Sequence, residues 1–168
     1  MILEIAAIVA GMLVSFFLKD INFLSLNYVY PDFLIIFIIY FALRRNVLSG
    51  IWIGFFAGLL EDSAVLVFSQ KAGAYLNVMG VHMFFYTLMG YIFGKLNRFI
   101  DSNSVLPVGA AVFAAALSVR VSIWLTAGIM SEFNKNFMFI LPAIYTALMA
   151  PIWFWILGWL YRLPVEEK

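Results

Sequence analysis

The sequence predicts an all-α integral membrane protein, a six-helix transmembrane bundle, and three observations lead to this fold class. Of 168 residues, 65% are hydrophobic and only 11% are charged, and the mean hydropathy is +1.04. A soluble domain carries about 25% charged residues, and a soluble chain this apolar would expose patches that aggregate. The apolar runs do not alternate with polar residues at every second position, as membrane barrel strands would. Because only helices and closed barrels satisfy the backbone in lipid, the runs are predicted to be helices.

Six apolar runs are close to the length of about 20 residues that a helix needs to cross the hydrocarbon core. In chain order they cover residues 2–18, 24–43, 47–68, 78–96, 105–130 and 137–161. The first run lacks a basic start and a small-residue cleavage site, so it is interpreted as a retained span and not as a signal peptide. The polar interruptions are too short to fold alone, and 1–168 is expected to form a single transmembrane domain.

The distribution of lysine and arginine predicts the orientation. With six spans, both termini lie on the same side of the membrane. That side carries Arg44, Arg45, Lys95, Arg98, Arg162 and Lys168. The opposite side carries Lys19, Lys71 and Lys135. The bias predicts a multi-pass membrane protein with both termini in the cytoplasm.

The second span raises a question of length, because its apolar run contains Pro31 and Asp32. Proline suits the first helical position, so the helix is predicted to begin at Pro31. From there to Leu43 the helix would rise only about 20 Å, against a hydrocarbon core about 30 Å thick. Asp32 would then lie in the first turn, below the outer surface and covered by protein, where the helix dipole favours a carboxylate. The alternative is a helix that starts at the outer headgroups with a solvated Asp32.

Small residues recur at helical spacing in two spans. The third span carries Gly50, Gly54 and Gly58, and the fourth carries Gly90 and Gly94. Glycines four residues apart let another helix approach closely. These positions, together with Gly80 in the fourth span, are therefore predicted to pack against a helix, either within the fold or from a partner protein.

Charged residues inside the apolar runs are predicted to form an intramembrane polar network of Asp32, Asp62 and Arg120. An unpaired arginine at such depth costs at least about 2.5–3.5 kcal/mol. Asp62 is the favoured partner of Arg120 because it lies on a longer helix, with Asp32 as the second choice and a partner protein or a wet crevice as the alternatives. Glu61 is expected in a structural ion pair, and the single histidine, His82, is interpreted as a packing residue.

The composition also excludes several kinds of chemistry. There is no cysteine, and a single histidine cannot form a multi-histidine metal site. No nucleophile-elbow, phosphate-loop or zinc-protease motif is present. The net charge of +1 gives no indication of a nucleic-acid partner. The chain is therefore predicted to be no enzyme and to need no cofactor or metal.

Three stretches together resemble one known family. They are PDFLIIFIIYFALRR, SGIWIGFFAGLLED and MGVHMFFYTLMGYIFGKL, and they contain the residues Pro31, Asp32, Arg44, Arg45, Gly50, Gly54, Phe55, Gly58, Asp62, Gly80, Gly90 and Tyr91. Over about residues 31–98 this pattern is similar to that of the rod-shape-determining membrane protein family MreD. Two departures are a long segment between Asp62 and Gly80, and Met79 and His82 beside Gly80.

The resemblance implies a non-enzymatic subunit of the bacterial cell-elongation (rod) complex that helps organise peptidoglycan synthesis and cell shape. Its direct partner would be MreC, a single-span protein with a periplasmic coiled coil. Through MreC it would join MreB, the glycosyltransferase RodA and a class B penicillin-binding transpeptidase, with membrane lipids around it. The family's fold is similar to that of the substrate-binding S components of energy-coupling-factor vitamin transporters.

An S component is the alternative function, since six spans and a small-residue first helix also fit it. The outward-facing starts of the second, fourth and sixth helices would favour an anionic ligand. The sequence lacks a rich set of polar ligand contacts, and the Pro-Asp and glycine pattern favours the scaffold.

Overall fold

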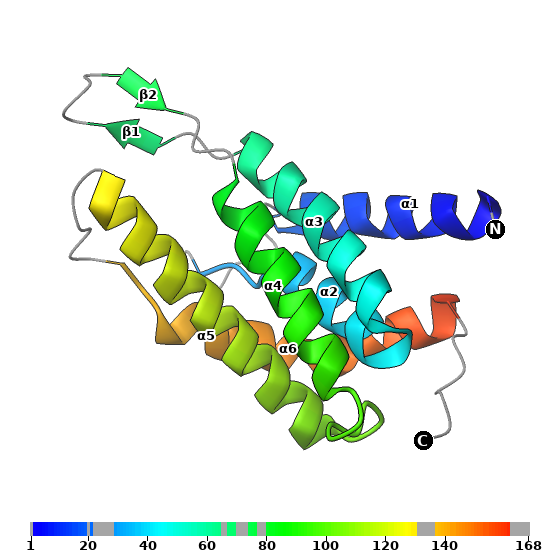
Figure 1. The fold of residues 1–168 in the computed structure, drawn as a ribbon. Coiled ribbons are helices and arrows are strands. Elements are labelled where there is room, and N and C mark those ends of the chain that lie inside the picture. The colour runs from blue at the N-terminus through cyan, green and yellow to red at the C-terminus, as the bar shows by residue number, and fades with distance from the viewer. Residues whose placement is uncertain are drawn as a thin grey trace.

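The protein folds into six helices and a small two-stranded sheet within the residues that its structure, a computed structural model, describes: 2–19, 21, 29–64, 67–69, 74–76, 80–130 and 137–161. The helices are α1 (Ile2–Leu18), α2 (Phe33–Arg44), α3 (Val47–Ala64), α4 (Val81–Leu96), α5 (Val105–Met130) and α6 (Ile140–Tyr161). Strands β1 (Val67–Ser69) and β2 (Ala74–Leu76) pair antiparallel between α3 and α4. The predicted class, an all-α membrane protein, is confirmed (Figure 1).

The helix boundaries agree with the sequence prediction in part. The limits of α1 and α5 are those predicted, whereas α4 and α6 each begin three residues later. The prediction that the third span continues to Phe68 is wrong, because α3 ends at Ala64 and Phe68 lies in β1. By length and composition, three helices within the described residues can cross a membrane: Val47–Ala64, Val105–Thr126 and Ile140–Tyr161. Glu4–Leu18 and Phe33–Arg44 are shorter apolar helices.

Helix α2 is the centre of the bundle. Every residue from Phe33 to Leu43 is buried, and each of the other helices contacts α2. A helix that is apolar on all sides belongs in the interior. Its twelve residues rise about 18 Å, so the expected short helix covered by protein is what the structure contains.

The start of α2 differs from the prediction. The helix begins at Phe33, because Asp32 is its N-cap: the Asp32 Oδ1 atom accepts a hydrogen bond from the Ile35 backbone N–H at 3.1 Å. A side-chain cap of this kind satisfies one of the otherwise unpaired donors of the first turn. Pro31 therefore precedes the cap and does not occupy the first helical position.

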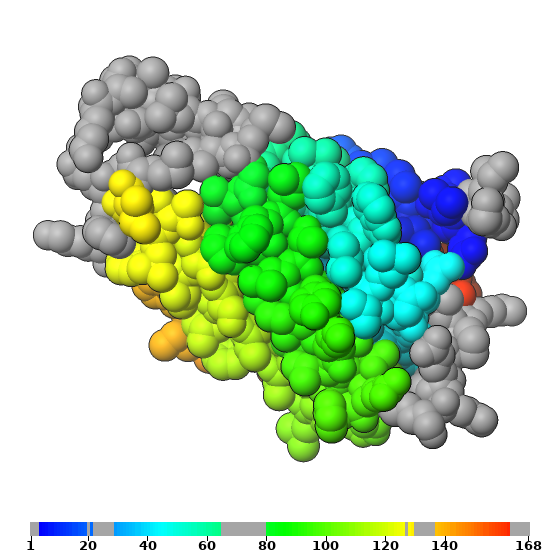
Figure 2. Space-filling view, viewed as in Figure 1, coloured from blue at the N-terminus to red at the C-terminus, as the bar shows by residue number. Residues whose placement is uncertain are grey.

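Helices α3 and α4 pack backbone to backbone through their glycines. A Cβ atom at Gly50 would lie 2.6 Å from the Gly90 carbonyl oxygen, and one at Gly58 would lie 2.5 Å from the Met83 nitrogen. Gly54 meets the backbone of Tyr86 in the same way, and Gly94 meets Val47. The close approach is thus made within the chain, and α3, α4 and α5 lie side by side on one face of the molecule (Figure 2).

Polar contacts at the predicted cytoplasmic end join the helices. Arg44 donates to the Ser102 carbonyl oxygen at 3.1 Å and to the Asn103 Oδ1 at 2.7 Å, which ties α2 to the α4–α5 turn. Arg45 forms an ion pair with Glu4 at 2.7 Å, and this contact holds the start of α1. Both arginines lie at the end of α2 that the basic-residue bias assigns to the cytoplasm.

Candidate functional site

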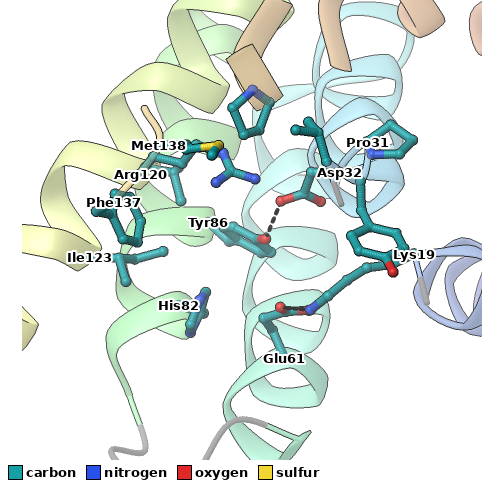
Figure 3. A pocket seen from close by; sticks show the side chains of 14 residues that line it. Lys19, Pro31, Asp32, Glu61, His82, Tyr86, Arg120, Ile123, Phe137 and Met138 are labelled. Carbon is teal, nitrogen blue, oxygen red and sulfur yellow. Dashed lines mark hydrogen bonds and ion pairs between the residues drawn. The ribbon is translucent and has the colours of Figure 1, made fainter. Parts of the chain in front are cut away.

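A cavity of about 510 Å³ lies above the N-terminal end of α2. Its lining comes from the end of α1, the segment before α2, helices α3, α4 and α5, and the start of α6 with the segment that leads into it (Figure 3). The lining residues are Lys19, Val29, Tyr30, Pro31, Asp32, Glu61, His82, Tyr86, Val119, Arg120, Ile123, Phe137, Met138 and Pro142. Arg120 is the sixteenth residue of α5, about 22 Å from its start, so the cavity is in the predicted outer half of the membrane.

Asp32 is held in the cavity wall by two helices that are far away in the sequence. Its Oδ2 atom accepts a hydrogen bond from the buried Tyr86 hydroxyl at 2.9 Å. Its backbone N–H donates to the Thr146 Oγ1 of α6 at 3.0 Å. These contacts support the interpretation that α2 begins beneath other parts of the protein, and they argue against a solvated Asp32 at the headgroups.

Lys19 and Glu61 form an ion pair at the edge of the cavity, between the end of α1 and α3. Glu61 is 5% exposed, and its second carboxylate oxygen, Oε2, has no hydrogen-bond partner within the described part of the chain. The structure thus contains the structural ion pair that was expected for Glu61. It leaves one buried acceptor of that pair unused.

Arg120 enters the cavity from α5, and its guanidinium points toward Tyr86 and Asp32 (Figure 3). It forms no hydrogen bond and no ion pair with any residue that the structure describes. The cavity lining therefore contains two cations, Lys19 and Arg120, and two carboxylates, Asp32 and Glu61, of which only Lys19 and Glu61 are paired with each other.

Asp62 does not share this cavity, so the preference for Asp62 as the partner of Arg120 is wrong. The carboxylate of Asp62 is 1% exposed and accepts three backbone hydrogen bonds at the start of α4. They come from Gly80 at 2.7 Å, His82 at 2.9 Å and Met83 at 3.1 Å. The dipole at this helix end favours a carboxylate, and Asp62 satisfies it without an arginine.

Gly80 and His82 complete this arrangement, and neither acts only as a packing residue. Gly80 is the N-cap of α4 with a φ of 102°, a conformation that glycine adopts at low cost. A Cβ at this position would meet nothing within 4 Å, so Gly80 serves the turn and does not make the close helix contact that was expected of it. His82 contacts the Asp62 carboxylate through Nδ1 at 2.8 Å.

Three residues of the site escaped the sequence analysis: Lys19, Tyr86 and Thr146. Lys19 could have been assigned to Glu61, because both follow apolar runs toward the same side of the membrane. A tyrosine or threonine inside an apolar helix gives no comparable signal, since it is tolerated in many membrane environments. Within the described residues no three His, Asp or Glu side chains come together in a way that could hold a metal ion.

Comparison with known proteins gives one match. A family model described as rod shape-determining protein MreD matches residues 1–163. Searches of curated proteins and of solved structures found no match.

Proposed function

The chain belongs to the MreD family of rod shape-determining proteins, and from this membership we propose that it is a non-enzymatic scaffold of the bacterial cell-elongation complex. In this proposal it spans the cytoplasmic membrane several times, with both termini in the cytoplasm. It binds MreC directly, and through MreC it joins MreB, RodA and a class B penicillin-binding transpeptidase to organise peptidoglycan synthesis. The observation that carries the proposal is the family match over residues 1–163.

The packing of α3 and α4 supports a rigid scaffold. Their glycine positions are occupied within the chain, so a partner helix has no room at this seam. Partner binding by helix packing must then use faces that the bundle leaves exposed. Several exposed faces follow a spacing of four residues, among them one on α1 with Ile5, Val9 and Leu13 and one on α5 with Val121, Leu125 and Ile129.

The proposal is tested by expressing the tagged chain together with MreC and purifying it in mild detergent. MreC is expected to co-purify in a fixed ratio. Val9→Trp and Val121→Trp then test the α1 and α5 faces as the interface, because a bulky ring at a helix contact blocks close packing. Loss of MreC in one variant and retention in the other identifies the face. A correctly folded parent chain that never captures MreC would refute direct binding.

A second experiment asks whether the rigid α3–α4 seam is needed. Gly58→Leu places a side chain against the Met83 backbone, and overpacking of this kind costs about 1–3 kcal/mol or more. The matched control is Gly158→Leu on α6, where a Cβ would meet nothing within 4 Å. We expect Gly58→Leu to lower the yield of folded chain and of captured MreC, and the control to behave like the parent. Equal behaviour of the two variants would show that the seam tolerates a side chain.

The alternative function, an S component of a vitamin transporter, has one structural observation in its favour, the 510 Å³ cavity. Such a volume is typical of small-molecule sites. The family match favours the scaffold. Co-purification separates the two functions, because an S component would bring down transporter subunits and a vitamin, whereas a scaffold would bring down a single-span coiled-coil protein.

A further inference from the structure

The cavity above the N-terminal end of α2 has charges of both signs. Lys19 and Arg120 contribute two positive charges to the lining, and Asp32 and Glu61 contribute two negative charges. The net formal charge of these four residues is zero. His82 also lines the cavity, but its ring contacts Asp62, which lies outside it. Ionisable groups inside a membrane protein are expected to be paired, so a cavity that is neutral overall but contains unpaired charged groups is unusual.

Arg120 is the first of two groups in the cavity with unused hydrogen-bonding capacity. A guanidinium binds carboxylate and phosphate oxygens through paired N–H donors, and Arg120 has none of these within the described chain. The Arg120 guanidinium points toward Asp32 (Figure 3), but no ion pair joins the two, and the Asp32 oxygens accept from Ile35 and Tyr86. Arg120 therefore offers a site for an anionic group that enters the cavity.

Glu61 is the second group. Its Oε1 pairs with Lys19, whereas its buried Oε2 has no donor. A buried charged acceptor without a donor is destabilising, because the group has lost its hydration without gaining a hydrogen bond. The terminal torsion of a glutamate is broad and nearly two-fold, so a rotation of the carboxylate can present this oxygen to a donor in the cavity. A protonated amine would satisfy it.

An ion of a single sign would satisfy only one of these groups. A lone anion would lie close to Asp32 and Glu61, and a lone cation would lie close to Arg120. A ligand that carries both signs satisfies both groups and adds no net charge to the cavity. Part of the remaining lining is apolar, with Ile123, Phe137 and Met138 beside Arg120 (Figure 3), and this part suits a hydrocarbon portion of the ligand.

We propose that the cavity binds a zwitterionic ligand in which an anionic group contacts Arg120 and a protonated amine contacts Glu61. Phosphoethanolamine carries both groups. As the headgroup of phosphatidylethanolamine it is a phosphodiester with no net charge, and as a free molecule it is a phosphate monoester with a net negative charge at pH 7. The volume of 510 Å³ is within the range of about 300–1,000 Å³ of small-ligand sites. The site does not depend on MreC, and its test uses the chain alone.

The first measurement is the thermal unfolding of the purified full-length chain in detergent, titrated with free phosphoethanolamine. Inorganic phosphate and ethanolamine serve as matched probes of one sign each. We expect a saturable rise in the unfolding temperature with phosphoethanolamine and a much weaker one with either half. In parallel, the chain is placed in nanodiscs of phosphatidylethanolamine, phosphatidylglycerol or phosphatidylcholine, and retained lipid is counted by native mass spectrometry. Binding of the free molecule alone identifies a soluble ligand, and retention of phosphatidylethanolamine alone identifies a lipid.

Two variants test the two contacts separately. Arg120→Gln should reduce the affinity for phosphoethanolamine about tenfold or more, since one charge-assisted contact is lost. Glu61→Gln should reduce it to the level of inorganic phosphate. Controls are Arg98→Gln and Glu4→Gln, which remove the same charges at exposed positions outside the cavity. If Arg120→Gln fails to fold, Arg120→Lys keeps the charge and should retain part of the affinity.

Three results would overturn the proposal. Phosphate could bind as tightly as phosphoethanolamine, which would make the cavity a simple anion site. Binding could be unchanged in both cavity variants, which would place the ligand elsewhere. A folded chain could bind neither the free molecule nor the lipid, and fill the cavity only when a segment of a partner protein is present.

Discussion

Asp62→Ala is expected to destabilise the chain more than any other single removal of a carboxylate. The Asp62 carboxylate replaces the side-chain cap that Gly80, the N-cap of α4, cannot provide. It accepts the backbone N–H groups of Gly80, His82 and Met83, and it contacts the His82 ring. Alanine would leave three buried or part-buried donors at the start of α4 without an acceptor.

The magnitude follows from two limits. Loss of an N-cap alone costs about 0.5–2 kcal/mol, and this is the lower limit if water replaces the carboxylate. Loss of a hydrogen bond to a buried charge adds about 1.5–3 kcal/mol. A total of about 2–5 kcal/mol corresponds to a fall in the unfolding temperature of about 4–20 °C for a chain of this size, at about 2–4 °C per kcal/mol. Asp62→Asn should lose less, because one amide oxygen can still accept from the helix start.

The assay is thermal unfolding in mild detergent, followed by the fluorescence of the tryptophans. Asp101→Asn is the matched control, since Asp101 also accepts from a backbone N–H in a turn but is exposed. The control should fall by no more than about 2 °C, because exposed substitutions away from special features stay within about 0.5 kcal/mol. If Asp62→Ala and Asp101→Asn melt together, the carboxylate does not hold the start of α4, and the argument from the hydrogen bonds fails.

Three further predictions concern orientation and the cavity. A cysteine at Asn103 should be protected from a membrane-impermeant thiol reagent in intact cells and one at Ser63 should react; the opposite pattern would invert the assigned orientation. Arg120→Leu and Asp62→Leu should be additive in a double-mutant cycle within about 0.5 kcal/mol, because Asp62 lies outside the cavity, and a larger coupling energy would restore the rejected pair. Tyr86→Phe should cost about 1.5–3 kcal/mol of unfolding free energy, since it removes the donor to the Asp32 carboxylate, and an unchanged melting temperature would show that this hydrogen bond is not needed.

The sequence predicts those parts of the fold that depend on hydropathy alone. Helices α1 and α5 have the predicted limits because each apolar run begins and ends with the helix itself. The end of α3 was missed since Val67 and Phe68 are as apolar as a membrane helix, although they form a strand. The predicted start of α2, Pro31, is two residues before the observed start, Phe33. Proline is favoured at the first helical position, but here the side chain of Asp32 caps the helix and Pro31 precedes the cap.

The candidate site shows a different limit. The sequence identifies Asp32, Asp62 and Arg120 as costly residues at similar depth, and the structure places Asp32 and Arg120 around one cavity. The sequence does not reveal which acid each donor contacts, because residues at equal depth can face different helices. The contact of Asp62 with the start of α4 depends on the turn at Gly80. The positive φ of Gly80 is a property of the folded backbone, and the sequence alone does not show it.

The length of the central helix α2 is not constrained by the thickness of the membrane. Since α2 is enclosed by the other helices, lipid never contacts it, and its length has no mismatch cost against the bilayer thickness. The outer helices alone must match the membrane. Each turn added at the start of α2 would fill about 5.4 Å of the space above it, and each turn removed would deepen that space. Relatives of this chain can therefore change the depth of the cavity by changing the length of α2, while the surface that meets the lipid stays the same.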